Sequence, residues 1–320
     1  MIDRWIAEAA RTIREIGAGN PRFEAELLLA HAIGRPRAFL FTHPEYVPAD
    51  EEQARLNELL GRRLSGEPLQ YVLGTAAFRE LTLRVGPGVL IPRSETEVLV
   101  GIVWDALQLW RKGARRYTST AAPGKGREKP WVIDVGVGSG AILLALVHEA
   151  LHQLPAEGAW PGPGDLWFDP LGIDLSPVAL GYTVDNARLN GLPRPLLIRG
   201  DLLSAVRAPC VPGGQVAAIV SNPPYITSAE MAELAPEIRE HEPPVALHGG
   251  ADGLEVIRRL LDEAEPFVRQ GALLGFEIGA TQEVAVGDEL ARRGHGGLTT
   301  IHSDLAGRPR VVLVEPPALG

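Results

Sequence analysis

Apolar residues recur at two different spacings along the chain, and the change between them divides the sequence. Through residues 1–70 they fall three or four positions apart, which predicts a small module of amphipathic helices. Asn20 and Pro21 predict the start of the second helix, because asparagine caps helices and proline fits their first position. Asp50 is predicted to cap a further helix. We read this module as a substrate-recognition domain, because it contains no catalytic constellation.

Residues 71–91 change to a pattern close to alternation, with apolar side chains at Phe78, Leu81, Leu83 and Val85. This pattern predicts a β-hairpin that links two domains. An apolar helix follows at residues 98–110. Ser94 and Glu97 have the spacing of a capping box at its start.

From residue 131 onward, short apolar runs alternate with helical patterns, so the second domain is assigned to residues 92–320. Repeated β-α units predict an α/β fold with a mostly parallel sheet covered by helices on both faces, closed by a pair of strands near the end of the chain. The predicted strands are residues 131–135, 171–174, 196–199, 216–220, 272–278, 298–303 and 310–315. The predicted helices are residues 141–151, 176–190, 254–268 and 281–293.

Two segments rich in glycine and proline, at residues 111–130 and 155–170, interrupt this alternation and are predicted to be surface inserts. The first carries seven basic residues against one acidic residue. A solvated loop is the preferred interpretation of that charge, and a basic patch for RNA is the alternative.

Charge and cysteine content narrow the class of protein. The net charge of −9 over 320 residues is not the broad basic footprint typical of duplex-binding proteins. The single cysteine, Cys210, excludes an intramolecular disulfide and fits a reducing cytoplasm. Neither a signal peptide nor an apolar run of membrane-spanning length is present, so we expect a cytoplasmic protein.

Candidate chemistry begins where the first strand of the second domain ends. Asp134 is followed by Gly136, Val137, Gly138, Ser139 and Gly140, and then by a helix. Glycines let the backbone turn tightly and approach a ligand, and a helix N-terminus points N–H groups at it. The same residues satisfy a dinucleotide pattern, but the early acidic residue and the alternating glycines favour a nucleoside with a charged amino-acid tail.

Acidic residues lie where the next two predicted strands end: Asp174 is the last residue of the second strand, and Asp201 comes shortly after the third. Asp174 can accept both hydroxyls of a ribose, although a helix cap is the alternative because Ser176 and Pro177 follow. Asp201 is a candidate for an adenine edge, with Leu202 as an apolar wall. The carboxyl ends of neighbouring parallel strands meet at one edge of a sheet, so these residues should face a common cleft.

The strand at residues 216–220 runs into Asn222, Pro223, Pro224 and Tyr225, where the prolines must end the ladder. Together with the glycine loop and the two acidic positions, this segment resembles class I S-adenosylmethionine-dependent methyltransferases that act on planar, amide-like nitrogens. Such a nitrogen is a poor nucleophile. The Asn222 side-chain oxygen and the Pro223 carbonyl can accept its two N–H groups, which aligns it and stabilises the positive charge that develops on it. Tyr225 can pack on the planar group.

Further stretches occur in the order found in the release-factor glutamine methyltransferases, the HemK/PrmC type, which the chain resembles over nearly its whole length. They are residues 68–71, 91–97, 134–140, 221–226, 241–243, 276–279 and 304–308. The resemblance implies methylation of the glutamine in the Gly-Gly-Gln motif of peptide chain release factors. It also implies cofactor binding by the glycine loop, Asp174, Leu202 and Asn222, and substrate binding by residues 222–225. Arg93 is expected near the cleft mouth, on the substrate side.

Two departures from the family pattern are visible: Leu202 stands where the family usually has an aromatic residue, and Ser94 where it has proline. The alternatives are an adenine N6-methyltransferase of nucleic acids and a glutamine methyltransferase of a ribosomal protein. A nicotinamide-dependent oxidoreductase would leave Asn222 to Tyr225 unexplained, and a non-catalytic module would bind cofactor without turnover. The eight histidines show no metal-binding spacing, so no metal is assigned.

Overall fold

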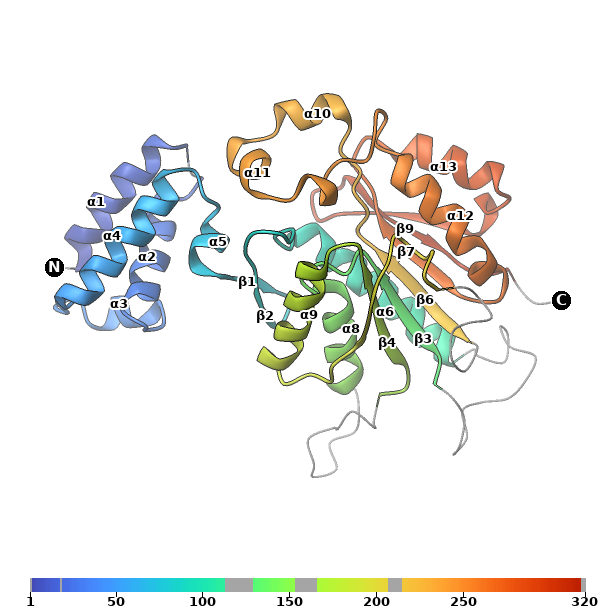
Figure 1. Ribbon diagram of the computed structural model, residues 1–320, viewed down its shortest axis with the longest axis horizontal. Coiled ribbons are helices and arrows are strands. Elements are labelled where there is room, and N and C mark those ends of the chain that lie inside the picture. Colours follow the sequence, from blue (N-terminus) through green and yellow to red (C-terminus); the bar gives the residue numbers. More distant parts are fainter. Residues whose placement is uncertain (1, 18, 113–128, 153–165, 207–214, 318–320) are drawn as a thin grey trace. The chain divides into compact units, whose positions relative to one another are not determined.

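The computed structural model describes residues 2–17, 19–112, 129–152, 166–206 and 215–317 (Figure 1). Two compact units divide the chain. The first comprises Met1–Ala76, Val85–Pro87 and Leu234–Glu242, and the second comprises Ala77–Arg84, Gly88–Glu233 and Pro243–Gly320. The predicted domain boundaries at residues 70 and 91 stay a prediction. Most of the two predicted inserts, and Cys210, lie outside the described residues.

The first unit is helical, as its sequence pattern predicts. Its helices are α1 (Ile2–Glu15), α2 (Pro21–Ala32), α3 (Ala38–Thr42), α4 (Asp50–Leu64), α5 (Leu69–Leu73) and α11 (Pro236–His241). The predicted cap of α2 is confirmed, because Asn20 Oδ1 accepts a hydrogen bond from the Phe23 amide at 3.3 Å. The predicted cap at Asp50 is wrong: Asp50 is the first helical residue, and Ala49 is the N-cap. The Ala49 amide is satisfied instead by the Glu52 carboxylate at 2.8 Å.

Glu26 and Arg63 are charged side chains buried within this unit. Glu26, 2% exposed, accepts hydrogen bonds from Arg22 at 3.0 Å and from Arg37 at 2.6 and 2.9 Å. Arg63 in α4 contacts Glu24 at 2.8 Å and Glu237 of α11 at 3.2 Å. Glu26 and Arg63 therefore each have two side-chain partners of opposite charge, which offset the cost of removing a charge from water.

The two-stranded sheet of β1 (Thr75–Phe78) and β2 (Leu81–Arg84) follows α5. The predicted hairpin is therefore present, but it is shorter than the assigned linker at residues 71–91. The helix α5 occupies the start of that linker. Its five residues are too few for the 3.6-residue period to be visible in the sequence.

A seven-stranded sheet forms the centre of the second unit, in the order β5-β4-β3-β6-β7-β9-β8. The strands β3, β4, β5, β6 and β7 are parallel, and β9 runs antiparallel to both β7 and β8, which confirms the predicted class of sheet. The strands are β3 (Trp131–Val135), β4 (Asp169–Asp174), β5 (Leu196–Arg199), β6 (Val216–Ser221), β7 (Leu273–Glu277), β8 (Thr299–Ser303) and β9 (Pro309–Val314). The helices are α6 (Ser94–Lys112), α8 (Ala141–His152), α9 (Pro177–Leu189), α10 (Ser228–Glu233), α12 (Glu255–Arg269) and α13 (Glu283–Arg292), with short 3-10 helices η2 (Pro244–Ala246) and η3 (Gly296–Leu298).

Alternate residues of each central strand enter different cores, because successive side chains of a strand point to opposite faces. Val132 and Val220 pack with α6 and α8 on one face of the sheet. Ile133 and Ile219 pack with α12 and α13 on the other face (Figure 1). The buried sheet thus holds the carboxyl ends of β3, β4, β5 and β6 in one row.

Two local predictions in this unit are wrong. The proposed capping box fails because α6 already begins at Ser94, and Glu97 Oε1 instead accepts from the Arg79 amide at 3.0 Å. The second predicted insert, which runs to residue 170, extends too far along the chain. Leu166 and Phe168 are buried core residues, and β4 starts at Asp169. The proline and tryptophan content of that segment concealed the approach to the strand.

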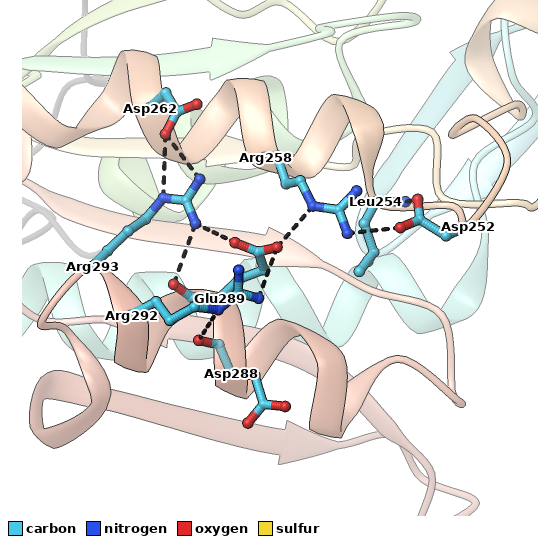
Figure 2. A network of polar contacts seen from close by, with 8 residues as sticks. All are labelled: Asp252, Leu254, Arg258, Asp262, Asp288, Glu289, Arg292 and Arg293. Atoms are coloured by element: carbon cyan, nitrogen blue, oxygen red, sulfur yellow. Dashed lines mark hydrogen bonds and ion pairs between the residues drawn. The ribbon is translucent and has the colours of Figure 1, made fainter.

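An ion-pair network connects α12 to α13 (Figure 2). Glu289, 5% exposed at its side chain, lies among Arg258 at 2.7 Å, Arg292 at 3.0 Å and Arg293. Arg258 also reaches Asp252 at 2.6 Å. Hydrogen bonding to Arg258, and to a smaller extent to Arg293, lowers the pKa of Glu289 to about 2.

No helix among the described residues has the length and apolar character needed to cross a membrane.

Candidate active site

A cavity of about 770 Å³ opens beside the carboxyl ends of the parallel strands in the second unit. Its volume falls within the range of small-molecule sites. The predicted site residues that line it come from the loops after β3, β4, β5 and β6 and from the approach to α6. They are Arg93, Gly136, Val137, Gly138, Ser139, Asp174, Asp201, Leu202, Asn222 and Pro224. Of the remaining predicted residues, Gly140, Pro223 and Tyr225 are not among the lining residues.

The glycine loop after β3 is tied to the neighbouring strand. The amides of Gly136 and Val137 both donate to the Ile173 carbonyl, at 2.8 and 2.9 Å. Gly138 follows with φ +56°, which a side chain would strain. Gly140 has a packing role instead, because a Cβ there would lie 2.9 Å from Leu144 Cδ1. The loop therefore presents backbone to the cavity and lets α8 begin close behind it.

Asp134 lies beneath this loop and is 1% exposed. Its Oδ2 accepts a hydrogen bond from the Leu143 amide at 3.1 Å, in the first turn of α8. Burial raises the pKa of Asp134 to about 8. This residue is not among those that line the cavity, so its contact is with the loop's own scaffold.

Asp174 joins two cavity walls. Its Oδ2 accepts from the Gly138 amide at 2.9 Å, and its Oδ1 accepts from the Ser176 amide at 2.8 Å. The cap of α9 is the Ser176 hydroxyl, which accepts from the Ala179 amide at 3.3 Å. Burial raises the pKa of Asp174, while these amide hydrogen bonds oppose the shift. A carboxylate oxygen has more than one lone pair, so each can also accept a ligand hydroxyl.

Asp201 and Leu202 line the cavity after β5, where they are expected. Asp201 also has a partner that the sequence did not reveal: Arg259 of α12 reaches its Oδ2 at 2.8 Å. Arg259 itself lines the cavity. Leu202 has φ +49°, an uncommon conformation for a branched side chain. If Asp201 faced the adenine edge, it would do so with a carboxylate that already accepts a hydrogen bond from Arg259.

The segment after β6 is connected to two residues that had no assigned role. Asn222 Nδ2 donates to Thr96 Oγ1 at 3.1 Å, and Thr96 Oγ1 donates to Glu277 Oε2 at 2.6 Å. The Tyr225 hydroxyl donates to Glu277 Oε1 at 2.8 Å. Glu277, at the end of β7, is 1% exposed. Thr96 and Glu277 fall within the family-like stretches at residues 91–97 and 276–279. The pairing of β7 with β6 brings Glu277 beside this segment, and the first turn of α6 brings Thr96.

Gln282 fixes the backbone of the same segment. Its Nε2 donates to the Tyr225 carbonyl at 2.9 Å and its Oε1 accepts from the Gly279 amide at 2.8 Å. Gly253 lies against this carbonyl, since a Cβ there would be 2.3 Å from Tyr225 O.

Within the described ranges, no group of three or more His, Cys, Asp or Glu side chains is placed to hold a metal ion.

A mostly parallel sheet in this order, with a glycine loop, a carboxylate after the next strand and an Asn-Pro-Pro-Tyr end of β6 around one cavity, defines a class I S-adenosylmethionine-dependent methyltransferase. The cavity suits that cofactor: its volume accommodates a nucleoside with an amino-acid tail, and Gly136 and Gly138 leave room beside it.

Comparisons with known proteins identify the family. Residues 4–74 match the model of the PrmC N-terminal domain. A release factor glutamine methyltransferase of Moorella thermoacetica is 37% identical over 311 residues, covering 96% of both chains. One from Streptomyces coelicolor is 35% identical, covering 95% of this chain and 94% of its own. This chain belongs to the family of release factor glutamine methyltransferases.

Proposed function

We propose that the protein transfers a methyl group from S-adenosylmethionine to the side-chain amide nitrogen of the glutamine in the Gly-Gly-Gln motif of peptide chain release factors. Its family membership supports this substrate. Release factors would then be its protein partners, with no stable nucleic-acid complex, and the reaction would take place in the cytoplasm. The observation that carries the proposal is the position of Asn222, which directly follows β6 and lines the same cavity as the glycine loop and Asp174.

The proposed cofactor site is formed by the loops after β3, β4, β5 and β6. Asp174 would accept ribose hydroxyls, Leu202 would form an apolar wall and Asp201 would face the adenine edge. Asn222 would border both ligands. The glycine-loop contribution would come from Gly136, Val137, Gly138 and Ser139, with Gly140 acting through packing. When bound, S-adenosylmethionine supplies an electrophilic methyl group on its sulfonium.

The residues of the chain would act on the glutamine nitrogen. The Asn222 Oδ1 and the Pro223 carbonyl would accept its two N–H groups, and Tyr225 and Pro224 would pack on the planar amide. Arg93 would contact the substrate at the cavity mouth. Two fixed acceptors orient the nitrogen lone pair and stabilise the positive charge that grows there as the N–C bond forms and the C–S bond to the sulfonium breaks. The nitrogen would then release one of its two protons to water, which leaves a neutral N-methyl amide.

Replacing Asn222 tests these roles. Asn222→Ala should keep the fold and lower kcat by about 10²- to 10³-fold, the usual cost of removing one preorganised polar group. Gln270→Ala, which removes an exposed carboxamide at the end of α12, is the control and should leave kcat unchanged. Circular dichroism would verify folding of both variants. Full activity of Asn222→Ala would contradict the proposed site.

The choice of substrate is tested by labelled methyl transfer to release factor, ribosomal protein and DNA, measured side by side. We expect label only in the release factor, and none when its Gly-Gly-Gln glutamine is replaced by glutamate. Incorporation into DNA adenine or into a ribosomal protein would favour one of the two alternatives over the proposal.

A further inference from the structure

The hydrogen bonds around Glu277 determine which end of the Asn222 carboxamide can face a substrate. A carboxamide offers an acceptor on one side and a donor on the other, and a half-turn of the side chain exchanges them. Only the acceptor suits a substrate nitrogen that carries two N–H groups. The two orientations of the Asn222 carboxamide have nearly the same shape. The enzyme therefore needs a means of keeping Asn222 in the orientation that presents its oxygen to the substrate.

The Thr96 hydroxyl can supply this selection because it has a single proton. That proton is directed to Glu277 Oε2 at 2.6 Å, so the oxygen of Thr96 is left to accept. Asn222 Nδ2 donates to it at 3.1 Å. If Asn222 turned around, its Oδ1 would meet the lone pairs of Thr96 with no proton between them.

Glu277 anchors the arrangement from the core. Its two oxygens accept from Thr96 and from the Tyr225 hydroxyl, at 2.6 and 2.8 Å. The side chains come from three elements, namely the first turn of α6, the segment after β6 and the end of β7. Ser221 pairs with Phe276 in the sheet, so Asn222, the first residue after β6, and Glu277, the last residue of β7, both follow that pair directly. Glu277 and Thr96 are 1% and 3% exposed, which leaves little water to compete for these bonds.

We propose that Thr96 and Glu277 are positioning residues that hold Asn222 with its oxygen available to the substrate and fix Tyr225 beside it. This inference rests on the proposed role of Asn222. Thr96 and Glu277 should therefore affect turnover through Asn222 and Tyr225. They should have little effect on the affinity for S-adenosylmethionine.

Thr96→Val and Thr96→Ser test the proposal as a pair, because they differ in the hydroxyl. Thr96→Val should lower kcat for release factor by about tenfold or more, the value of one lost buried hydrogen bond. Thr96→Ser should restore kcat to within about threefold, and the Kd for S-adenosylmethionine should change less than about threefold in both. Thr300→Val, which removes an exposed hydroxyl of β8 outside the cavity lining, is the control and should leave kcat unchanged. Wild-type kcat in Thr96→Val, or equal losses in both variants, would overturn the proposal.

Glu277→Gln provides a second measurement that does not depend on Thr96→Val folding. A glutamine offers one acceptor where Glu277 offers two, so Thr96 and Tyr225 can no longer both donate to it. We expect a kcat loss of about tenfold or more with Kd for S-adenosylmethionine retained. Unchanged kcat would count against the proposal.

Combining Thr96→Val with Asn222→Ala separates this inference from the proposed function. If Thr96 acts through Asn222, the double variant should be no slower than Asn222→Ala in single-turnover labelling, and additive losses would refute that route. Full activity of Asn222→Ala alone would instead refute the proposed site. Inactive Asn222→Ala together with active Thr96→Val would refute only the positioning role.

Discussion

Gly253 controls the position of the Asn-Pro-Pro-Tyr segment by having no side chain. Its φ is +74°, and a Cβ would lie 2.3 Å from the Tyr225 carbonyl oxygen and 2.5 Å from Gln282 Nε2. Real Cβ atoms essentially never approach closer than 3.0 Å, so the Tyr225 backbone would have to move by about 0.7 Å. Gly253→Ala therefore perturbs the proposed substrate site through the Tyr225 backbone, without replacing any residue assigned to that site.

The expected loss of stability has two sources. A left-handed backbone costs alanine about 1–2 kcal/mol relative to glycine. Displacing Gln282 from the Tyr225 carbonyl adds about 1–3 kcal/mol, because a buried acceptor loses its partner. We expect Gly253→Ala to lower the free energy of unfolding by about 2–5 kcal/mol. A displacement approaching 1 Å should also lower kcat by about 10- to 100-fold.

Gly294→Ala is the matched control. Gly294 has φ +82°, but a Cβ there would meet no atom within 4 Å. It should lose only the backbone contribution of about 1–2 kcal/mol and keep its kcat. Urea unfolding gives the stability of both variants, and labelled methyl transfer at a temperature where both are folded gives kcat. Equal stability losses, or an unchanged kcat in Gly253→Ala, would show that the close approach does not govern the segment.

Two further predictions concern buried charges. Glu289→Gln should lower the free energy of unfolding by about 1–3 kcal/mol near neutral pH. The folded pKa of Glu289 is lowered from 4.5 to about 2, so the extra stability of the wild type over the variant is present above pH 4.5 and is lost as pH falls through about 2. Urea unfolding at a series of pH values measures this difference. A difference that does not change with pH would contradict the prediction. Glu26→Gln should destabilise the first unit by about 1–3 kcal/mol, because Arg22 and Arg37 lose a buried carboxylate. Glu8→Gln, in the exposed Arg4–Glu8 pair, should change thermal unfolding little, and equal effects of the two substitutions would refute the importance of burial.

Periodicity predicts most of the second unit because the central strands β3, β6 and β7 are buried along their whole length and appear as continuous apolar runs. The strands at 131–135 and 196–199 have the predicted bounds, and the others differ by a few residues at either end. The failures were local. The α5 helix is one turn long, and the entry to β4 contains Asp169 and Pro170, which do not have the composition of a strand.

For the candidate site too, the sequence predicts some features and not others. Sequence spacing located the glycine loop, Asp174, Asp201, Leu202 and Asn222, because each directly follows a predicted strand and strand ends converge. It could not assign partners that are distant in sequence. Thr96 is 126 residues from Asn222, and Asp201 is 58 residues from Arg259. These pairs depend on strand order and helix packing, which local patterns do not encode.

The first unit is discontinuous in sequence, because Leu234–Glu242 belongs to it although these residues lie between β6 and α12. A gene fragment that encodes only Met1–Ala76 would therefore lack α11 and leave Arg63 with Glu24 but without Glu237. The two units are consequently poor candidates for separate expression or for shuffling between homologues at a single junction. A chimera that exchanges the first unit should carry both segments together, since two separate pieces of chain make up this one compact unit.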